Sequence, residues 1–223
     1  MSDNNSDMKA RVEFWAEDTK FCWDGVAARI EWIALQEISL GKVKFTNSNN
    51  ASIATEYDVD YLIPASQKKG VDTSYTSGTS GKPLTKDFPA AIAAGKAIGA
   101  HYRYVFMNPN TFDELVSQTE VIKRCATFVQ NATESADTPD LTTLNAYLAK
   151  RKETYKGLQV IIIDQDITIE KADGTRVTGN PFADHVMMFS ESKVLGNTWW
   201  KRPIDAKKMP GSVAEKAMHG HTL

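Results

Sequence analysis

The stretch Ala27–Phe45, AARIEWIALQEISLGKVKF, joins the end of a helix to the start of a strand. Its apolar residues recur at steps of three and four, the spacing that places side chains on one face of a helix. Gly41 follows the last of them and suits a helix C-cap, because glycine adopts left-handed backbone angles without steric cost. We therefore predict a helix that ends at Leu40 and a strand over the residues that follow.

The same apolar pattern continues from this stretch towards the N-terminus, to about Lys9. The positions that carry it are Phe14, Trp15, Phe21, Cys22, Val26, Ile30, Ile33, Ala34 and Ile38. A helix of about thirty residues is long for a globular domain, so we expect a spine on which other elements pack. We expect the part from Phe14 to Ile38 to share one core with the strands. Residues 1–8 are polar, and we expect them to be frayed.

Two strands and a long loop are predicted after the helix. The segment TEYDVDYLIP alternates Tyr57, Val59 and Tyr61 with acidic residues, which is typical of a half-buried strand. Residues 65–86 are polar and rich in Ser, Thr, Gly and Lys, which predicts a mobile loop. We expect a protease to cut this loop first, at its lysines.

The second half of the chain alternates predicted helices and strands. The expected helices are KDFPAAIAAGKAIGAHY, two short ones in NPNTFDELVSQTEVIKRCATFVQNA, and DLTTLNAYLAKRKETY. The expected strands are YRYVFMNP, LQVIIID, a hairpin in DITIEKADGTRVTG, and HVMMFS. Asn110 or Thr111 is the expected cap of the first short helix. LQVIIID is expected to be a central strand because its apolar run does not alternate, and Asp173-Gly174 is the expected hairpin turn. This order of elements predicts an α+β fold.

The composition is that of an ordinary globular chain. Of the 223 residues, 42% are hydrophobic and 24% are charged, which is enough apolar material for a core. The formal net charge of -2 produces no field that favours DNA or an anionic membrane. Cys22 and Cys125 lack a metal-ligand spacing, which argues against a zinc site and fits a reducing compartment. The polar N-terminus is not a signal peptide, and no apolar run is long enough to span a bilayer.

The segment YTSGTSGKP, Tyr75–Pro83, is similar to the phosphate-binding loop of adenylate-forming enzymes. Glycines allow the backbone to approach a phosphate, and hydroxyl groups donate to its oxygens. However, Leu84 stands where that loop has its lysine, and the chain is far shorter than those enzymes. The spacing before Gly81-Lys82 does not fit a Walker loop either. We therefore interpret the segment as an ordinary loop and expect no ATP binding.

Other candidate residues are better explained by structure than by catalysis or metal binding. Asp164 and Asp166 with His185 could hold a divalent cation. The structural interpretation of Asp164 is that it ends a buried strand, where aspartate is common as a turn former. Cys125 lies on an amphipathic helix, which favours a place in the core over a role as nucleophile.

The remaining histidines and the tryptophan pair also have structural interpretations. His101, His219 and His221 have no Ser, Cys or Glu partner at a telling spacing. Trp199 and Trp200 could stack on nucleic-acid bases, but the near-neutral charge favours a role in a strand or a subunit contact. We therefore assign no catalytic, cofactor-binding or metal-binding residues and expect no cofactor.

Four blocks of the sequence, in order, resemble tailed-phage major capsid proteins, in the branch that contains the phage lambda head protein. AARIEWIALQEISLGKVKF resembles the end of their spine helix, and TEYDVDYLIP the strand that follows. GKPLTKDFPAAIAAGKAIGAHYRYVFMNPNTFDELVSQTEVIK resembles the next block, and IIIDQDITIEKADGTRVTGNPFADHVMMFSESKVLGNTWW the late block. The resemblance covers most of residues 25–203. It also implies that Lys82, Pro83 and Leu84 form the entry into a helix.

The resemblance implies a Hong Kong 97-type fold, with an axial and a peripheral domain. The expected division is a spine helix with peripheral-domain strands in 1–64, a flexible loop in 65–86, an axial-type α+β domain in 87–190, and a return strand with a tail in 191–223. Family members carry an N-terminal arm and an extended loop before the spine helix, whereas this chain begins at that helix. We therefore expect a fragment, a truncated prophage gene or a processed product. Without those extensions, we expect a monomer or small oligomer.

The function implied by the resemblance is that of a structural shell subunit of a phage or prophage, without catalysis. Its expected partners are copies of itself in hexamers and pentamers, with scaffold and decoration proteins, and neither sequence-specific nucleic acid nor a membrane. The expected location is the virion, and the bacterial cytoplasm during assembly. Two alternatives are an encapsulin-like compartment shell and an ATP-dependent adenylate-forming enzyme or a fragment of one. ATP binding would separate the enzyme from the shell proteins.

Overall fold

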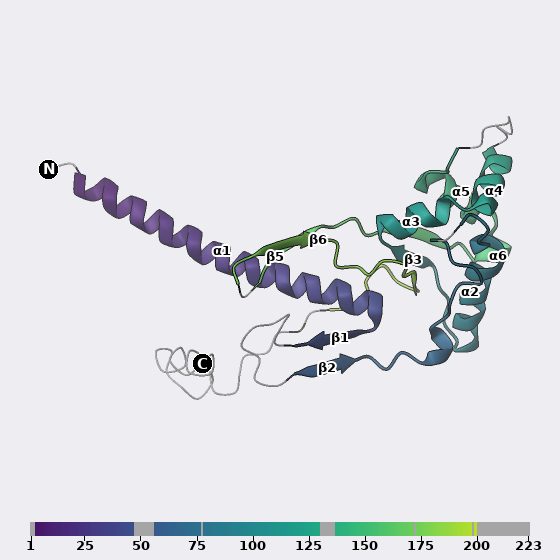
Figure 1. Cartoon of the computed structure of the whole chain (residues 1–223), viewed down its shortest axis with the longest axis horizontal. Coiled ribbons are helices and arrows are strands. Elements are labelled where there is room, and N and C mark those ends of the chain that lie inside the picture. Colours follow the sequence, from purple (N-terminus) through teal and green to yellow (C-terminus); the bar gives the residue numbers. More distant parts are fainter. Residues whose placement is uncertain are drawn as a thin grey trace.

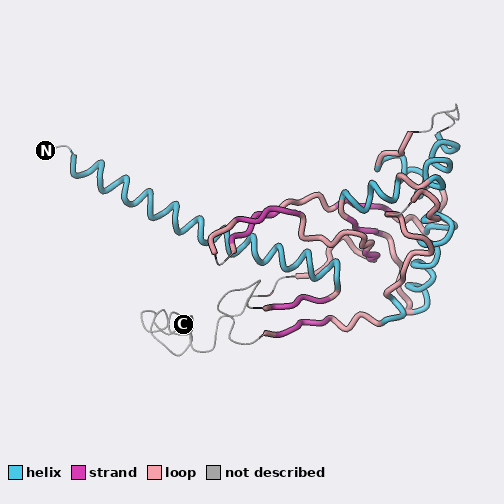
Figure 2. Tube along the Cα trace, viewed as in Figure 1, coloured by secondary structure: helices cyan, strands magenta, loops and turns pink. Residues whose placement is uncertain are grey.

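The structure, a computed structural model, consists of a long helix that projects from a mixed α+β body (Figure 1). It describes residues 3–46, 56–76, 78–129, 137–171, 173–197 and 199. Figure 2 shows that the body gathers its helices on one side, around a small sheet. The expected α+β class is confirmed. None of the described helices is both long and apolar enough to cross a membrane.

The long helix α1 spans Asp3–Leu40 and ends where the sequence predicts. Gly41 follows it with a φ of 67°, and its N–H donates to the carbonyl of Glu37 at 2.7 Å. The expected fraying of residues 1–8 is wrong from Asp3 onward, because these residues are helical.

A two-stranded antiparallel sheet follows α1. It consists of β1, Lys42–Phe45, and β2, Tyr57–Asp60, so both predicted strands are confirmed, although Tyr61 lies beyond β2. Lys42 lies opposite Asp60 and Lys44 opposite Asp58, whereas Val43 pairs with Val59. Val43 is buried and the lysines are exposed. The two faces of the sheet therefore differ as the alternation predicts.

The body contains a three-stranded sheet in the order β4-β3-β7. Strand β3, Tyr104–Met107, pairs in parallel with β4, Gln159–Ile162, and antiparallel with β7, Met188–Ser190. The prediction of a central strand in LQVIIID is therefore wrong, because β4 is at the edge of this sheet. Helix α5, Leu141–Lys150, packs on β4, and Asn145 bonds to both the N–H and the carbonyl of Val160. Burial on its faces, rather than a strand on each side, explains the apolar run.

In the described residues, seven helical segments build the rest of the body. They are η1, Ala65–Gln67, η2, Pro83–Asp87, α2, Phe88–Ala97, α3, Pro109–Val116, α4, Thr119–Val129, α5, Leu141–Lys150, and α6, Lys152–Tyr155. The core lies between these helices and the sheet. Its fully buried side chains include Phe88, Met107, Leu115, Leu144, Tyr147, Leu148 and Tyr155. The cap of α3 is Asn108, whose Oδ1 accepts from the N–H of Thr111 at 2.9 Å, and not Asn110 or Thr111 as predicted.

The predicted hairpin is confirmed and lies against α1 (Figure 1). It pairs β5, Ile167–Glu170, with β6, Arg176–Gly179, and Gly174 has a φ of 80° in the turn. The Arg176 guanidinium lies 5.5 Å from the centre of the Phe21 ring. The Gln165 side chain donates to Glu31 at 2.7 Å. The hairpin thus braces the middle of α1 from one side. No strand follows in the described residues 191–197, where a return strand was expected.

The segment 65–86 contains more ordered structure than a bare loop. Pro83–Asp87 form a helical turn, η2, that leads directly into α2, so the predicted loop ends at Lys82 and not at residue 86. Tyr75, Pro83 and Leu84 are buried. Pro83 opens the turn because its fixed φ suits the first helical position. The mobility of the remaining segment stays a prediction.

Candidate functional site

The most distinctive surface of the molecule is a row of exposed apolar side chains along α1. They are Met8, Val12, Trp23, Val26 and Ile30, each 47–76% exposed, and we call them the apolar stripe. Their separations correspond closely to whole numbers of helical turns, which places them on one face. The expectation that Phe14 to Ile38 shares one core with the strands is therefore wrong for the N-terminal part of that range. Phe14 itself is 67% exposed.

The other side of α1 is where the body makes contact. Phe21 and Glu31 face Arg176 and Gln165 of the hairpin segment. Towards the C-terminal end, the Ser39 hydroxyl donates to the carbonyl of Gln36 and accepts from the N–H of Ala183 at 3.1 Å. The helix is thus fixed at its middle and its end. Figure 1 shows its N-terminal part extending beyond the hairpin.

A groove of about 650 Å³ opens in the body, and we call it the α2–β7 groove. Its walls are the end of α1, the segment around η1, helix α2 and the chain that includes β7. Three of its apolar side chains, Leu40, Ile63 and Val71, are among the large hydrophobic residues that remain exposed. Lys68 and Lys69 are exposed and also line it. The groove is mainly apolar, and its charged lining residues include Asp87 as well as the two lysines.

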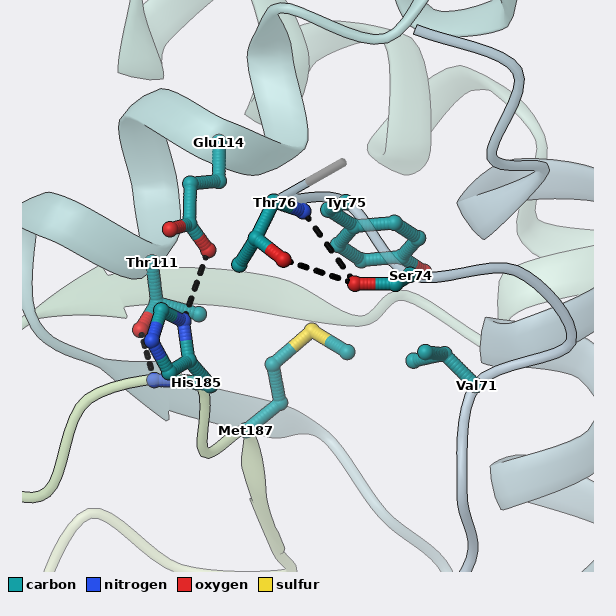
Figure 3. A pocket seen from close by; sticks show the side chains of 8 residues that line it. All are labelled: Val71, Ser74, Tyr75, Thr76, Thr111, Glu114, His185 and Met187. Carbon is teal, nitrogen blue, oxygen red and sulfur yellow. Dashed lines mark hydrogen bonds and ion pairs between the residues drawn. The ribbon is translucent and has the colours of Figure 1, made fainter. Parts of the chain in front are cut away.

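A smaller cavity of about 280 Å³ lies where α3 meets the chain after β6 (Figure 3). His185 Nδ1 lies 2.9 Å from a Glu114 carboxylate oxygen, and the His185 N–H donates to the Thr111 hydroxyl at 2.9 Å. Ser74 and Thr76 bond to each other on the facing segment at 2.8 Å. These contacts attach the β6–β7 connection to α3, an arrangement that stabilises structure.

The residues considered for a metal site are not brought together. Asp164 and Asp166 are exposed, whereas His185 pairs with Glu114. Across the described part of the chain, no three His, Cys, Asp or Glu side chains converge as a metal centre would require. Asp184, next to His185, accepts from the side chain of Asn110 at 3.1 Å.

The loop that resembles a phosphate-binding loop is turned towards the protein. Gln118, fully buried, accepts from the N–H of Gly81 at 2.9 Å. Its amide nitrogen donates to the carbonyls of Tyr75, Gly78 and Glu114 at 3.3, 3.1 and 2.9 Å. No local sequence pattern marks Gln118, because its partners Tyr75, Gly78 and Gly81 lie far earlier in the chain.

The burial of residues in and next to this loop shows that they pack in the protein rather than face a ligand. Leu84, in the place of the lysine of adenylate-forming enzymes, is fully buried, and its carbonyl accepts from the Tyr155 hydroxyl at 2.8 Å. Lys82 is exposed. Tyr75 donates to Asp87, and burial followed by that contact raises the pKa of the Tyr75 hydroxyl. The loop is therefore a packed entry to α2, as the resemblance implies.

The other residues singled out from the sequence are dispersed. Cys125 is 2% exposed and belongs to the core, as predicted, and burial raises the pKa of its thiol to about 11. His101 is exposed, and its backbone N–H donates to Glu191. Trp199 is 90% exposed. Trp200, His219 and His221 lie outside the described residues.

A family model described as phage major capsid protein E matches residues 4–215. The chain belongs to this family. A comparison with curated proteins found no match. The capsid protein is a structural subunit of a phage shell and a component of the virion, without enzymatic activity. Capsid proteins self-assemble, so apolar side chains that are exposed in one copy can be buried in contacts between copies. The adenylate-forming alternative is excluded, and the phage family takes precedence over the encapsulin-like alternative.

Proposed function

We propose that the capsid protein builds its shell through the apolar stripe, which contacts neighbouring copies. The observation that supports this is the exposure of five large apolar residues on one face of a well-formed helix. Exposed large apolar side chains gathered on one face are a feature of protein contact sites. Burying one such side chain contributes about 1.5–3 kcal/mol, so five of them favour association strongly.

The finer architecture that fits this role is a Hong Kong 97-type subunit in hexamers and pentamers. In this assignment, residues 1–64 form the spine helix and peripheral strands, and 87–190 form the axial-type domain. Two observations support it: α1 is continuous for 38 residues, and a compact helix-rich body lies at one end of it. The hairpin, within 87–190, contacts α1 and would join the two domains. Scaffold and decoration proteins are further proposed partners.

The test compares Trp23→Ala with Asp24→Ala, adjacent substitutions on different sides of α1. Trp23 is 76% exposed in the stripe, so its removal should weaken self-association at least about tenfold without loss of helix. Asp24→Ala should associate as the unaltered chain does. Sedimentation across a concentration series, with electron microscopy of the same samples, provides the measurement. Equal association of the Trp23→Ala variant and the unaltered chain would overturn the proposal.

A further inference from the structure

The apolar stripe belongs to a longer row of exposed residues that repeats along α1 with the period of a coiled coil. From Lys9 onward, these residues follow one another at steps of three and four in strict alternation. They are Lys9, Val12, Ala16, Thr19, Trp23, Val26 and Ile30, and we call them the seam. Met8 lies at its edge. Helices with this spacing pack in pairs, because the side chains of one helix fit between those of the other.

The body contacts α1 away from the seam. Phe21, which meets the hairpin, lies on the side of the helix opposite the seam by helical position. Glu31, which meets the segment before the hairpin, lies outside the seam as well. The exposed fraction falls from 76% at Trp23 to 47% at Ile30, towards the part of α1 that contacts the hairpin and β1 (Figure 1). The part of the seam most open to a partner is therefore Lys9–Val26, roughly 25 Å long.

The element of this chain that fits the seam is α1 itself. A seam of this kind packs against a helix that has an exposed apolar row of its own. In the described residues, no large exposed apolar side chain lies on helices α2 to α6. Helix α1 is continuous for 38 residues and cannot fold onto its own seam. Helix packing on the seam by this chain therefore requires α1 of a second copy.

Two copies of the seam match when the helices run in opposite directions. The midpoint of Lys9–Val26 is between residues 17 and 18, and a two-fold axis there sets the register. Val12 of one copy then faces Trp23 of the other, and the small residues Ala16 and Thr19 face each other at the centre. Lys9 faces Val26, with its aliphatic stem on the apolar side chain and its ammonium in water. Both helices are thus covered along the same length.

The same register pairs opposite charges. Glu13 and Lys20 are exposed and lie on the same flank of the seam by helical position. They are two turns apart, roughly 10 Å, which is too far for an ion pair within one helix. In the antiparallel pair, Glu13 of each copy lies opposite Lys20 of the other. Within its own copy Glu13 has Lys9 at 3.9 Å, so it would lie between two cations. Arg11 and Asp18 lie further round the helix, beyond the other flank.

From these observations we propose that the seam of α1 packs antiparallel against the seam of a second copy. The contact is isologous, because both copies use the same surface, and it joins the copies in pairs. This inference rests on the proposed function of the stripe and names its partner. A parallel pair would place Lys9 beside Lys9 of the second copy and both bodies at the same end of the helix pair. The antiparallel pair separates both the charges and the bodies, since each body lies at the C-terminal end of its own α1 (Figure 1).

Charge reversal tests the register. Lys20→Glu should weaken self-association several-fold, because it places two carboxylates opposite each other twice in the pair, and Glu13→Lys should weaken it through like cations. The double variant Glu13→Lys with Lys20→Glu should recover most of the affinity. The matched control is Glu17→Lys with Lys20→Glu, which has the same net charge but changes a residue on the far side of α1, and it should not recover. Sedimentation across a concentration series measures all four. Absence of recovery in the double variant would overturn the inference.

Cysteine cross-linking tests the direction of the helices. Two variants of the full chain, Lys9→Cys and Val26→Cys, each also carry Cys22→Ser. Their mixture should form a covalent dimer with oxidised glutathione, because the two positions face each other. Neither variant alone should do so, since its two thiols would be displaced by roughly 25 Å along the axis, beyond the reach of a disulfide. A dimer formed by Lys9→Cys alone would show a parallel pair and contradict the proposal.

The proposed function and this inference fail in distinguishable ways. If Trp23→Ala weakens association but the double charge reversal does not recover it and the mixture does not cross-link, the stripe meets a different surface and only the inference is overturned. If Trp23→Ala has no effect, both fail.

Discussion

Gly81 occupies a position where no side chain fits. A Cβ at this residue would lie 2.7 Å from a Tyr75 ring carbon and 2.8 Å from Gln118 Oε1. We expect Gly81→Ala to lower the free energy of unfolding by about 1–3 kcal/mol, because the ring and the buried amide must shift. Gly78→Ala is the matched control, since nothing lies within 4 Å of a Cβ there. Chemical denaturation measures both, and equal stabilities would contradict the role of Gln118 in holding this loop.

The two cysteines should differ sharply in reactivity. Cys22 is exposed, whereas Cys125 is buried and burial raises the pKa of its thiol to about 11. Because the thiolate is the reactive form, we expect one thiol to react with a chromogenic disulfide reagent at pH 8 and the second only after unfolding. Rapid reaction of both thiols in the native protein would place Cys125 outside the core.

At the residue scale, the sequence predicted those roles that depend only on residues nearby in the chain. The left-handed angles of Gly41 and Gly174 follow from local turn chemistry, and both were foreseen. Gln118 and Asn108 were missed. Gln118 bonds to residues far along the chain, and Asn108 combines a helix cap with a contact to Phe182. Such roles exist only once distant segments meet.

Helix α5 allows a test of pH dependence at the scale of an element. Its cap, Asp140, accepts from the N–H of Thr143 at 2.8 Å, and hydrogen bonds from Thr143 hold the pKa of Asp140 below its usual value. A carboxyl with a lowered pKa in the folded state stabilises above its unfolded pKa, and the contribution is lost as pH falls. Asparagine keeps a hydrogen-bond acceptor at this position but does not titrate. We therefore expect the free energy of unfolding of the Asp140→Asn variant to fall less between about pH 5 and about pH 3 than that of the unaltered chain.

Thermal unfolding across that pH range measures the difference. Asp173→Asn is a useful comparison, because hydrogen bonds from Thr175 lower the pKa of Asp173 in the hairpin turn. If the Asp140→Asn variant and the unaltered chain lose stability in parallel, the cap does not act through its charge.

At the element scale, periodicity predicted the type of most helices and strands but not their neighbours. The apolar run of β4 was interpreted as a central strand, whereas β3 holds that place. A run without alternation shows that both faces are covered, but helices cover a face as well as strands do. The alternation in β5 and β6 and the Asp173-Gly174 turn specified the hairpin, because register and turn are local.

At the scale of the whole molecule, the structure predicts where hydrogen exchange should change on assembly. Amides of α1 before Trp23 have solvent around their helix and should exchange early in the monomer. Those of β3, paired on both sides, should exchange late. We expect association to slow exchange in α1 and to leave β3 unchanged, as measured by mass spectrometry at low and high concentration. Unchanged exchange in α1 on association would contradict a role of this helix in contacts.

The sequence predicted the long helix but not its exposure. Periodicity identifies a helix face that avoids water, but it does not identify what covers that face. Nothing in the described part of the chain covers the stripe, whose side chains are 47–76% exposed. The candidate site was therefore not predicted, although Val26 and Ile30 were correctly placed on the apolar face.

The bracing of α1 has a mechanical consequence. From Phe21, the contact of the brace nearest the N-terminus, to Asp3, the helix extends roughly 27 Å at 1.5 Å per residue. A tilt of about 5° at the brace would therefore displace the tip by roughly 2 Å. Small rotations at the contacts with the hairpin segment are thus amplified into larger changes of reach. A stiff lever of this kind lets one unchanged subunit meet neighbours at slightly different angles, as curvature requires.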